Sequence, residues 1–372
     1  MAEWKEYKLG EIAEVQTGPF GSQLHMSDYK LIGTPIVTVE HLGENRIIHN
    51  NLPLVGEEDK KRLIKYTLRE GDIVFSRVGS VDRRAYISIK EDGWMFSGRC
   101  LRVRANKNKV NSKFLSYYFG QENFKEYIRR IAVGATMPSI NTSILNELDI
   151  FIPDLNHQIQ IATILSSLDD KIDLLHRQNK TLEHLAETLF RQWFVEEAEE
   201  SWEIGKLDDI AIFNNGKSRP EEIENGSVPI YGGNGILGYT NQSNYEDISI
   251  IIGRVGAYCG SLYIENKPIW LSDNALLTRS KQGNNFFLFY LLKSMELNSM
   301  AEGSSHPLLT QTLLKSIDLF IAPNERVRDF EIQVNEFWNK IYQNNNQIKT
   351  LCQLRDTLLP KLMSGEVRVS EL

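Results

Sequence analysis

The stretch Trp4-Lys-Glu-Tyr-Lys-Leu-Gly-Glu-Ile-Ala13 recurs 198 residues later as Trp202-Glu-Ile-Gly-Lys-Leu-Asp-Asp-Ile-Ala211. A second pair of segments follows in the same order, because Ile73-Val-Phe-Ser-Arg-Val-Gly79 returns as Ile250-Ile-Ile-Gly-Arg-Val-Gly256. A third segment, Gly134-Ala-Thr-Met-Pro138, returns after a shorter offset of 169 residues. A repeat of this length is typical of a duplicated domain. It predicts two similar globules, each with a similar task.

The composition places broad limits on the chain. It has 372 residues and a net charge of −7, and 41% of its residues are hydrophobic. The length fits two domains with connecting elements, and no apolar run is long enough to span a membrane. No secretion signal is visible at the N-terminus, and Cys100, Cys259 and Cys352 are far apart without metal-ligand spacing. We therefore expect a soluble cytoplasmic protein without a membrane partner.

Charge is spread unevenly over four predicted regions. They are a first globule (1–155), a central helical region (156–200), a second globule (201–325) and a distal helical region (326–372). Their net charges are +2, −5, −5 and +1 in that order. The acidic total gives no support for nucleic-acid binding, so such a function must rest on local patches or on a basic partner.

Each globule is predicted to mix strands and helices, in an α/β or α+β arrangement. Short β-branched runs bounded by glycine and charged residues predict the strands, and helical spacing of apolar residues predicts the helices. In the first globule we expect strands at 34–39, 72–76, 85–89 and 100–104 and helical structure over 114–131. In the second we expect strands at 248–252 and 261–264 and a helix at 286–295.

Two long segments carry an apolar seam with alternating spacings of three and four residues, sustained over about four heptads. Pro153 with Asp154 or Asn156 predicts where the first helix starts, and Gly365 predicts where the second ends. A helix over 157–194 would be roughly 55 Å long at 1.5 Å per residue. The seam residues are Leu165, Leu168, Ile172, Leu175, Asn179, Leu182, Ala186, Leu189 and Trp193, and then Val334, Phe337, Ile341, Asn344, Ile348, Leu351, Arg355, Leu358 and Leu362.

Two arrangements of these helices are open. Each helix could simply cover its own globule, or the two could pair with each other as an antiparallel coiled coil. Pairing is favoured, because a narrow seam requires a matching seam and the chain carries two. Asn179 and Asn344 would then fix the register, and the globules would sit at opposite ends with pseudo-twofold symmetry.

The sequence contains no recognisable catalytic motif. Gly233-Asn-Gly-Ile-Leu-Gly238 has the spacing of a dinucleotide-binding loop, but turn residues follow it where a helix is required. We find no metal-ligand spacing, no nucleophile elbow and no Asn-Pro-Pro-aromatic tetrapeptide of the kind that amino-methyltransferases use. We therefore expect a chain that binds rather than catalyses and that holds no metal of its own.

The candidate contact residues are polar and lie in predicted loops. Their side chains are of the types that bond phosphates and base edges, although each loop could equally be solvated or serve as a structural cap. Arg77 and Arg254 are equivalent in the two copies, and a salt bridge within each globule is the alternative role for them. The candidates are Ser22, Gln23, Arg77, Ser80, Arg83, Arg84, Thr136, Ser139 and Asn141, and then Lys217, Arg219, Asn234, Arg254, Tyr258, Ser304, Ser305 and His306.

The chain resembles the specificity subunit of type I restriction-modification enzymes over nearly its whole length. His157 departs from the family pattern, which usually has Glu there, and the distal copy lacks the box around Gln158. The resemblance rests on the repeated Trp-x5-Leu-x2-Ile-Ala opening and on the segments Thr17–Ser22, Gly71–Gly79, Ile152–Ile159, Ile164–Asp173, Leu189–Phe194 and Leu358–Glu366.

The resemblance implies two target-recognition domains, each reading one half of a split, asymmetric DNA sequence. It also implies that the paired helices hold the halves apart and dock two modification subunits. Those subunits would carry S-adenosylmethionine and methylate adenine N6, and two restriction subunits could add ATP- and Mg-dependent cleavage. The chain itself would hold no cofactor. The rival interpretation is a coiled-coil scaffold with two protein-binding globules and no role on DNA.

Overall fold

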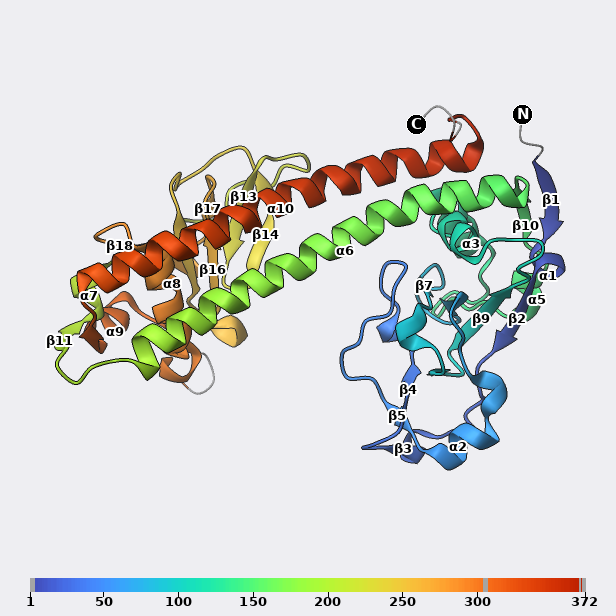
Figure 1. The fold of residues 1–372 in the computed structure, drawn as a ribbon, viewed down its shortest axis with the longest axis horizontal. Coiled ribbons are helices and arrows are strands. Elements are labelled where there is room, and N and C mark those ends of the chain that lie inside the picture. The colour runs from blue at the N-terminus through green and yellow to red at the C-terminus, as the bar shows by residue number, and fades with distance from the viewer. Residues whose placement is uncertain (1–3, 304–306, 368, 370–372) are drawn as a thin grey trace. The chain divides into compact units, whose positions relative to one another are not determined.

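The computed structural model contains two compact units, and it describes residues 4–303, 307–367 and 369. The first unit comprises Met1–Leu174 and Ile348–Leu372, and the second comprises Leu175–Gln347. Each unit contains one globule and one segment of each of the two long helices, α6 (Leu155–Arg191) and α10 (Asn324–Ser364) (Figure 1). The duplication expected from the sequence is therefore present as two separately packed bodies.

The first globule is built on a four-stranded antiparallel sheet. Its central strand β6 is buried at every position, because its run of Ile73, Val74 and Phe75 packs on both faces. The buried Asp72 at the start of β6 accepts hydrogen bonds from Arg104 on the neighbouring strand, at 2.7 and 2.6 Å. The sheet order is β2 (Ala13–Thr17), β9 (Cys100–Ala105), β6 (Asp72–Ser76) and β7 (Arg84–Tyr86).

A second sheet, built of shorter strands, completes this globule. Its strands β4 and β8 run parallel, and its buried residues form a separate core that includes Ile36, Leu42 and Phe96. The strands, in sheet order, are β3 (Tyr29–Lys30), β5 (Leu54–Val55), β4 (Thr34–Val37) and β8 (Met95–Phe96), and the short helix α2 (Glu57–Arg62) follows β5.

The helices of the first globule close the main core against α6. Ile161 and Leu165 of α6 and Leu362 of α10 belong to that core. The globule is tied together at its ends by β1 (Lys5–Lys8), which pairs antiparallel with β10 (Asp149–Ile152). Its helices are α1 (Leu9–Ile12), α3 (Ser112–Tyr118), α4 (Glu122–Ile131) and α5 (Thr142–Asn146).

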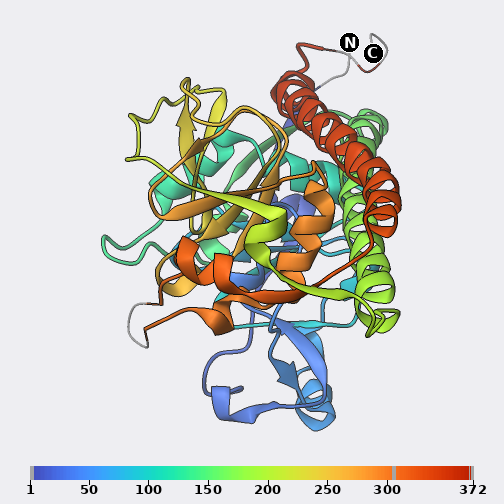
Figure 2. The same ribbon diagram turned by 90° about the vertical axis from the view of Figure 1, so that its left-hand side faces the viewer.

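The second globule repeats this layout, and Figure 2 shows it facing the viewer beside the long helices. Strands β13 and β17 run parallel, as β4 and β8 do. The main sheet is β12 (Ala211–Asn215), β18 (Ala275–Ser280), β15 (Ser249–Gly253) and β16 (Leu262–Glu265), and the small sheet is β14 (Gly235–Thr240), β13 (Val228–Gly232) and β17 (Trp270–Leu271). The remaining elements are the pair β11 (Glu203–Lys206) and β19 (Asp318–Ile321) and the helices α7 (Leu207–Ile210), α8 (Asn285–Ser294) and α9 (Gln311–Ser316).

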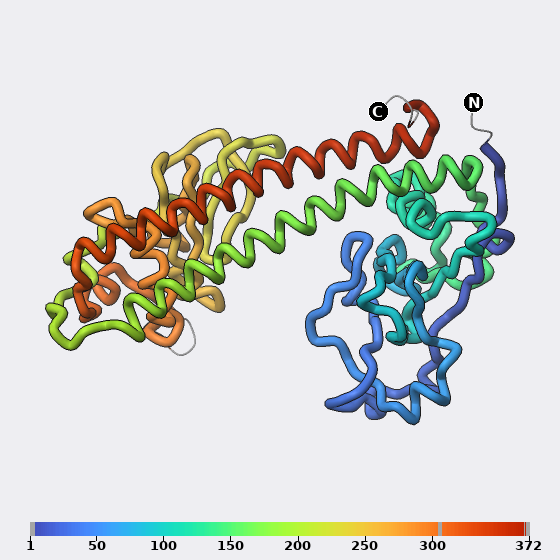
Figure 3. The backbone as a smooth tube through the Cα atoms, in the orientation of Figure 1, coloured from blue at the N-terminus to red at the C-terminus, as the bar shows by residue number. Residues whose placement is uncertain are grey.

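The long helices begin and end where the sequence predicts. Asp154 caps α6, since its carboxylate accepts the backbone N–H groups of Asn156 at 3.0 Å and His157 at 3.2 Å. Helix α6 passes into a π-helical turn at Gln192–Glu196. Helix α10 ends at Ser364, before Gly365 with a φ of 75°, a conformation that favours glycine. Figure 3 shows both helices as continuous coils.

The two helices pair with each other, antiparallel, within each unit. In the second unit the Asn344 amide donates to the Asn179 side-chain oxygen at 2.8 Å, and both residues are buried. In the first unit Arg355 of α10 lies 2.9 Å from Asp169 of α6. All of the predicted seam residues are buried or half-buried. The helices also cover their globules, so both arrangements considered from the sequence occur together.

The predicted strands at 72–76, 100–104, 248–252 and 261–264 and the helix at 286–295 match observed elements to within one residue. The strand expected at 34–39 ends at Val37, because Val39–His41 forms a 3-10 turn, and the strand expected at 85–89 is only Arg84–Tyr86. A further correction concerns 114–131, where helices α3 and α4 are separated around Gly120. A Cβ atom at Gly120 would lie 2.1 Å from the Arg84 guanidinium, so the chain bends there around a buried side chain from β7.

Candidate nucleic-acid interface

The first globule carries a braced loop where β6 ends. The Gly79 N–H donates to the carbonyl oxygen of Pro138 at 2.8 Å, and the Ile140 N–H donates to that of Arg77 at 3.0 Å. Gly79 has a φ of 74°, which allows the chain to turn immediately after Arg77 and Val78. These bonds hold the segment 133–141 against the end of the strand, so two of the polar segments selected from sequence lie together.

The second globule builds the same loop from equivalent residues. The Gly256 N–H donates to the Pro307 carbonyl at 3.0 Å, and the Leu309 N–H donates to that of Arg254 at 2.9 Å. Gly256 has a φ of 71°. We call this pair of backbone hydrogen bonds, with the loop that they hold, the frame of each globule. Since only backbone groups make the bonds, the frame can form whichever side chains the loop carries. Each globule thus has one copy of the same frame, and the two copies carry different polar side chains.

A third segment, the loop at 18–23, joins this frame in the first globule. The Gly18 N–H donates to the Cys100 carbonyl at 3.1 Å, which places the loop beside β9. The exposed ring of Phe20 lies 5.9 Å from the Arg77 guanidinium, and Arg77 also donates to the Gly98 carbonyl at 3.1 Å. The structure therefore brings together the segments around Phe20, Arg77 and Ser139 as one surface.

Most candidates of the first globule are accessible on that surface, but some have structural bonds. The Gln23 amide oxygen accepts from the Tyr66 hydroxyl at 2.9 Å, and the Asn141 side chain caps α5 by accepting from the Ile144 N–H at 2.9 Å. Ser139 donates to the Val133 carbonyl at 3.1 Å. The exposed residues are Ser22, Ser80, Arg83, Thr136 and Asn141, and Gln23, Arg77 and Ser139 are half-buried.

Arg84 was expected in an exposed loop, but it lies on β7 and is buried. Its side chain is only 4% exposed, and its Nε donates to the Ser116 carbonyl at 2.8 Å. Burial lowers the pKa of its guanidinium, and the nearby Glu44 carboxylate partly opposes that shift. The residue is therefore packed between β7 and α3, and it is reached only where it lines a small cavity with Glu44 and Lys125.

The second globule presents Lys217, Asn234 and Tyr258 as exposed side chains. Asn234 lies at the turn between β13 and β14. Arg219 is exposed but forms an ion pair with Glu222 and donates to the Leu237 carbonyl at 3.1 Å. Arg254 is half-buried, at the end of β15. The candidates Ser304, Ser305 and His306 lie outside the described residues.

Neither Arg77 nor Arg254 forms an ion pair within the described part of the chain, so the salt-bridge alternative does not apply to either residue there. Two exposed residues beside Arg77 in the first globule, Phe20 and Arg99, were not among the candidates chosen from the sequence. The Arg99 carbonyl accepts from the Arg77 N–H at 2.8 Å, so the two arginines are adjacent. The Gly-Pro-Phe-Gly signature could have identified Phe20, because glycines flank an aromatic residue in a loop.

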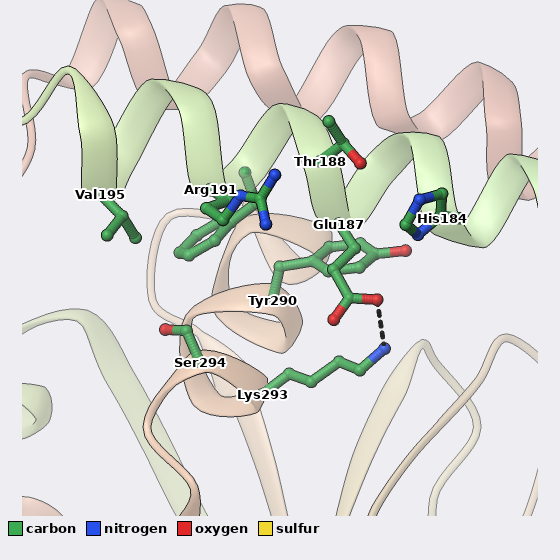
Figure 4. Close-up of a pocket in the computed structure, with 9 residues that line it drawn as sticks. His184, Glu187, Thr188, Arg191, Val195, Tyr290, Lys293 and Ser294 are labelled. Atoms are coloured by element: carbon green, nitrogen blue, oxygen red, sulfur yellow. Dashed lines mark hydrogen bonds and ion pairs between the residues drawn. The ribbon is translucent and has the colours of Figure 1, made fainter.

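A separate cavity lies elsewhere, between the C-terminal part of α6 and α8 in the second unit (Figure 4). Its volume is about 300 Å³. The Glu187 carboxylate and the Lys293 ammonium group lie 3.1 Å apart on its wall, as the dashed line in Figure 4 marks. His184, Arg191 and Tyr290 also line it.

Across the described residues, no group of three or more His, Cys, Asp or Glu side chains is arranged to hold a metal ion, and no helix is long and apolar enough to cross a membrane.

Comparisons with known proteins find relatives along the entire chain. The family described as "Type I restriction modification DNA specificity domain" matches residues 1–184 and, again, residues 199–349. The type I restriction enzyme MjaIX specificity subunit of Methanocaldococcus jannaschii is 26% identical over 421 residues, which cover 100% of this chain and 95% of the relative. The HindI specificity subunit of Haemophilus influenzae is 24% identical over 474 residues, which cover 99% and 100%.

A solved structure supports the fold. The type I restriction-modification S subunit from M. genitalium matches with a TM-score of 0.66 at 20% identity, over 97% of this chain and 96% of that one. This likeness confirms the expected arrangement of duplicated mixed globules alternating with two long helices. The family match falls once on each globule and together covers most of the chain. The protein belongs to the family of type I restriction-modification DNA specificity subunits.

Proposed function

We propose that this chain gives a type I restriction-modification enzyme its sequence specificity, with each globule binding one half of a bipartite double-stranded DNA target. The single observation that carries the proposal is the frame built twice, on Arg77 and on Arg254, with the same backbone hydrogen bonds and different surrounding side chains. A backbone that is the same in both globules but carries different polar side chains is what a reader of two different sequences requires, because base edges are recognised by side-chain donors and acceptors.

The two half-sites should differ. Arg77 of the first globule lies beside Phe20 and Arg99, whereas the second globule presents Lys217 and Asn234 as exposed side chains. The globules also differ in net charge, +2 for residues 1–155 and −5 for residues 201–325. Contacts made by such different groups favour different bases, so the target should be asymmetric.

The helical pair would set the separation of the half-sites and dock two modification subunits. Helix α6 has 37 residues, a length of roughly 55 Å at 1.5 Å per residue. Half-sites one turn of DNA apart lie about 34 Å from each other, so the helix has the right scale for a spacer. The modification subunits would bind S-adenosylmethionine and methylate adenine N6, and restriction subunits, where present, would use ATP and Mg. In this assembly the chain is a non-catalytic part that acts in the cytoplasm.

The acidic balance of the chain fits a shared DNA interface. A net charge of −7 opposes tight association with phosphates. Basic modification subunits would then supply much of the phosphate contact, while this chain supplies the base contacts. An isolated chain that bound DNA tightly, with a salt dependence as steep as that of the assembled complex, would exclude this division of labour.

Selection from a random pool of duplexes tests the proposal. The chain, purified together with its modification subunits, should enrich duplexes with two short conserved blocks separated by an unconserved spacer. Enrichment of one block alone would contradict the two-reader account. No enrichment by a complex that forms normally would instead favour the coiled-coil scaffold, the rival function for a chain with two globules and a helical pair.

A further inference from the structure

A small polar cavity lies beside the first DNA-reading surface, where β7, the loop before it and α4 meet. Its volume is about 160 Å³. Three cationic side chains, two of them consecutive in the sequence, surround it together with two carboxylates. The lining residues are Gly43, Glu44, Asp82, Arg83, Arg84 and Lys125.

The structure fixes one of these cations in place. The guanidinium of Arg84 is held by its bond to the Ser116 carbonyl, and Gly120 leaves the space that its Nη2 atom occupies. An arginine buried to this degree keeps its charge, because its ordinary pKa lies far above neutrality. Its charge is therefore positioned at the cavity wall rather than free to move into solvent.

The carboxylates compensate these cations incompletely. Glu44 is 66% exposed at its side chain, and its Oε1 lies 3.6 Å from Arg84 and 3.7 Å from Lys125, well beyond the 2.6 Å of the Arg104–Asp72 pair. Asp82 is shared, since its carboxylate lies 3.5 Å from Arg129. Lys125 also lies 3.8 Å from Glu122. The ion pairs of Glu44 are long and its own side chain is largely exposed, so this carboxylate can move into solvent when another anion binds.

Arg83 adds a cation at the mouth of the cavity. It is exposed and takes part in no ion pair within the described residues. Its backbone N–H donates to the Ser80 carbonyl at 3.1 Å, and its carbonyl accepts from the Ser76 N–H at 2.9 Å, which fixes the turn that follows Arg77 and Gly79. The turn that carries Arg83 to the cavity therefore follows directly on the braced loop of the first globule.

We propose that this cavity binds one phosphate diester of the DNA backbone, with Arg83, Arg84 and Lys125 around the phosphate and the Glu44 side chain displaced into solvent. The proposal rests on the DNA-reading function proposed above and adds to it a fixed anchor for the register of the first half-site. Phosphate contacts position a protein on the duplex without reading sequence, and arginine pairs well with phosphate oxygens.

The anchor belongs to the first globule. In the main sheets Arg84 pairs with Phe75, and Leu262 pairs with Ile252, which is the equivalent of Phe75 in the repeat. Leucine therefore stands in the second globule where the buried arginine stands in the first. The positive first globule would hold the backbone itself, whereas the acidic second globule would depend on a partner subunit for the same contact.

The salt dependence of DNA binding tests the anchor. The full chain in complex with its modification subunits is measured on a random-sequence duplex and on its selected target. Arg83→Gln and Lys125→Gln should each weaken binding by the same factor on both duplexes and reduce the slope of log affinity against log salt by about 1. Glu44→Gln should tighten binding. Lys107→Gln, at an exposed lysine in the turn after β9, is the matched control and should leave the slope unchanged.

Several results would overturn the anchor. Unchanged slopes for both Arg83→Gln and Lys125→Gln, with a lowered melting temperature, would show an internal ion network only. Stabilisation of the wild-type complex by inorganic phosphate, lost in these variants while the DNA slopes stay unchanged, would show a site for a free anion instead. A complex that selects no sequence would contradict the proposed function. The salt slope would still test the anchor in that case, because it is also measured on a random-sequence duplex.

Discussion

At the residue scale, the three cysteines should differ sharply in reactivity. Cys100 is fully buried, and burial raises the pKa of its thiol to about 12. Burial also raises the pKa of the Cys259 thiol, whereas Cys352 is half-buried on α10. The thiolate is the reactive form, so alkylation of the native chain near neutral pH should modify Cys352 first and Cys100 only after unfolding. Mass spectrometry of timed samples measures this order, and equal rates for Cys100 and Cys352 would refute it.

The buried Asp72 should be essential to the first globule. It accepts two hydrogen bonds from Arg104 and one from the Arg69 N–H at 2.8 Å, while being only 1% exposed. Asp72→Ala should lower the free energy of unfolding by about 3 kcal/mol, because it leaves a partly buried guanidinium unpaired. Chemical denaturation measures the loss. Asp149→Ala, which removes an exposed partner of Lys8, is the control and should change nothing measurable. Equal effects of the two changes would contradict this assignment.

The candidate residues show what sequence can and cannot predict at this scale. Arg77 and Arg254 were found because the repeat marks them as equivalent. The burial of Arg84 was not predicted, because three arginines within eight residues suggest an exposed loop. Its burial depends on Gly120, which is far away in sequence. Asn141 was read only as a polar loop residue, although it also caps a helix.

At the element scale, the asparagine pair should couple the two long helices. The buried Asn344 donates to Asn179, which in turn donates to the Asn345 side chain at 2.7 Å. Asn344→Leu alone should destabilise the chain by about 1–3 kcal/mol, because the Asn179 oxygen is left unpaired. The double change Asn179→Leu/Asn344→Leu should recover most of that loss. Thermal unfolding of the full chain gives the cycle, and additive effects would show that the pair is not coupled.

Different side chains attach the two long helices to their globules. Gln158 of α6 accepts the Asn111 N–H at 2.8 Å, just before α3 begins. In the distal copy, Glu331 of α10 accepts the N–H groups of Phe286 at 3.1 Å and Phe287 at 2.9 Å, at the start of α8. Glu331 is not at the position equivalent to Gln158. The distal helix therefore accepts the N–H groups of its globule through a residue one helical turn further along.

Glu331 should give the second unit a pH dependence. Burial raises the pKa of its carboxyl above the ordinary 4.5, and the backbone N–H groups only partly oppose this. A raised folded-state pKa contributes stability that is present below the unfolded pKa and is lost as pH rises through the folded value. Glu331→Gln lacks that loss. As pH rises from the ordinary carboxyl pKa through the folded-state pKa of Glu331, the melting temperature of the variant should therefore rise relative to that of the wild type. Glu336→Gln, at an exposed site on the same helix, should show a constant difference. A constant difference for Glu331→Gln as well would contradict the shift.

The elements themselves were mostly predictable from pattern. The seam of α6 and α10 was read correctly, because its heptad spacing and its caps are local features of the sequence. The break between α3 and α4 was not, since apolar residues keep a helical spacing across it. The missing information was tertiary, namely the Arg84 side chain that occupies the bend at Gly120.

At the scale of the whole molecule, the duplication predicted the fold. Both main sheets have the same strand order, and both braced loops use the same backbone hydrogen bonds. The shrinking offset between the copies reflects extra residues in the first globule, where β5 and α2 lie between β4 and β6. Which bases each globule reads could not be predicted, because recognition depends on side-chain geometry against DNA rather than on the frame.

The most direct test of the central claim is single-molecule methylome sequencing of the host with and without this gene. The account predicts an adenine-methylation motif with two different specific blocks separated by a nonspecific spacer, present with the gene and absent after deletion. A methylome that deletion leaves unchanged, although the modification subunits are expressed, would contradict the specificity function. Loss of a single palindromic motif would contradict the reading of two different half-sites by the two globules.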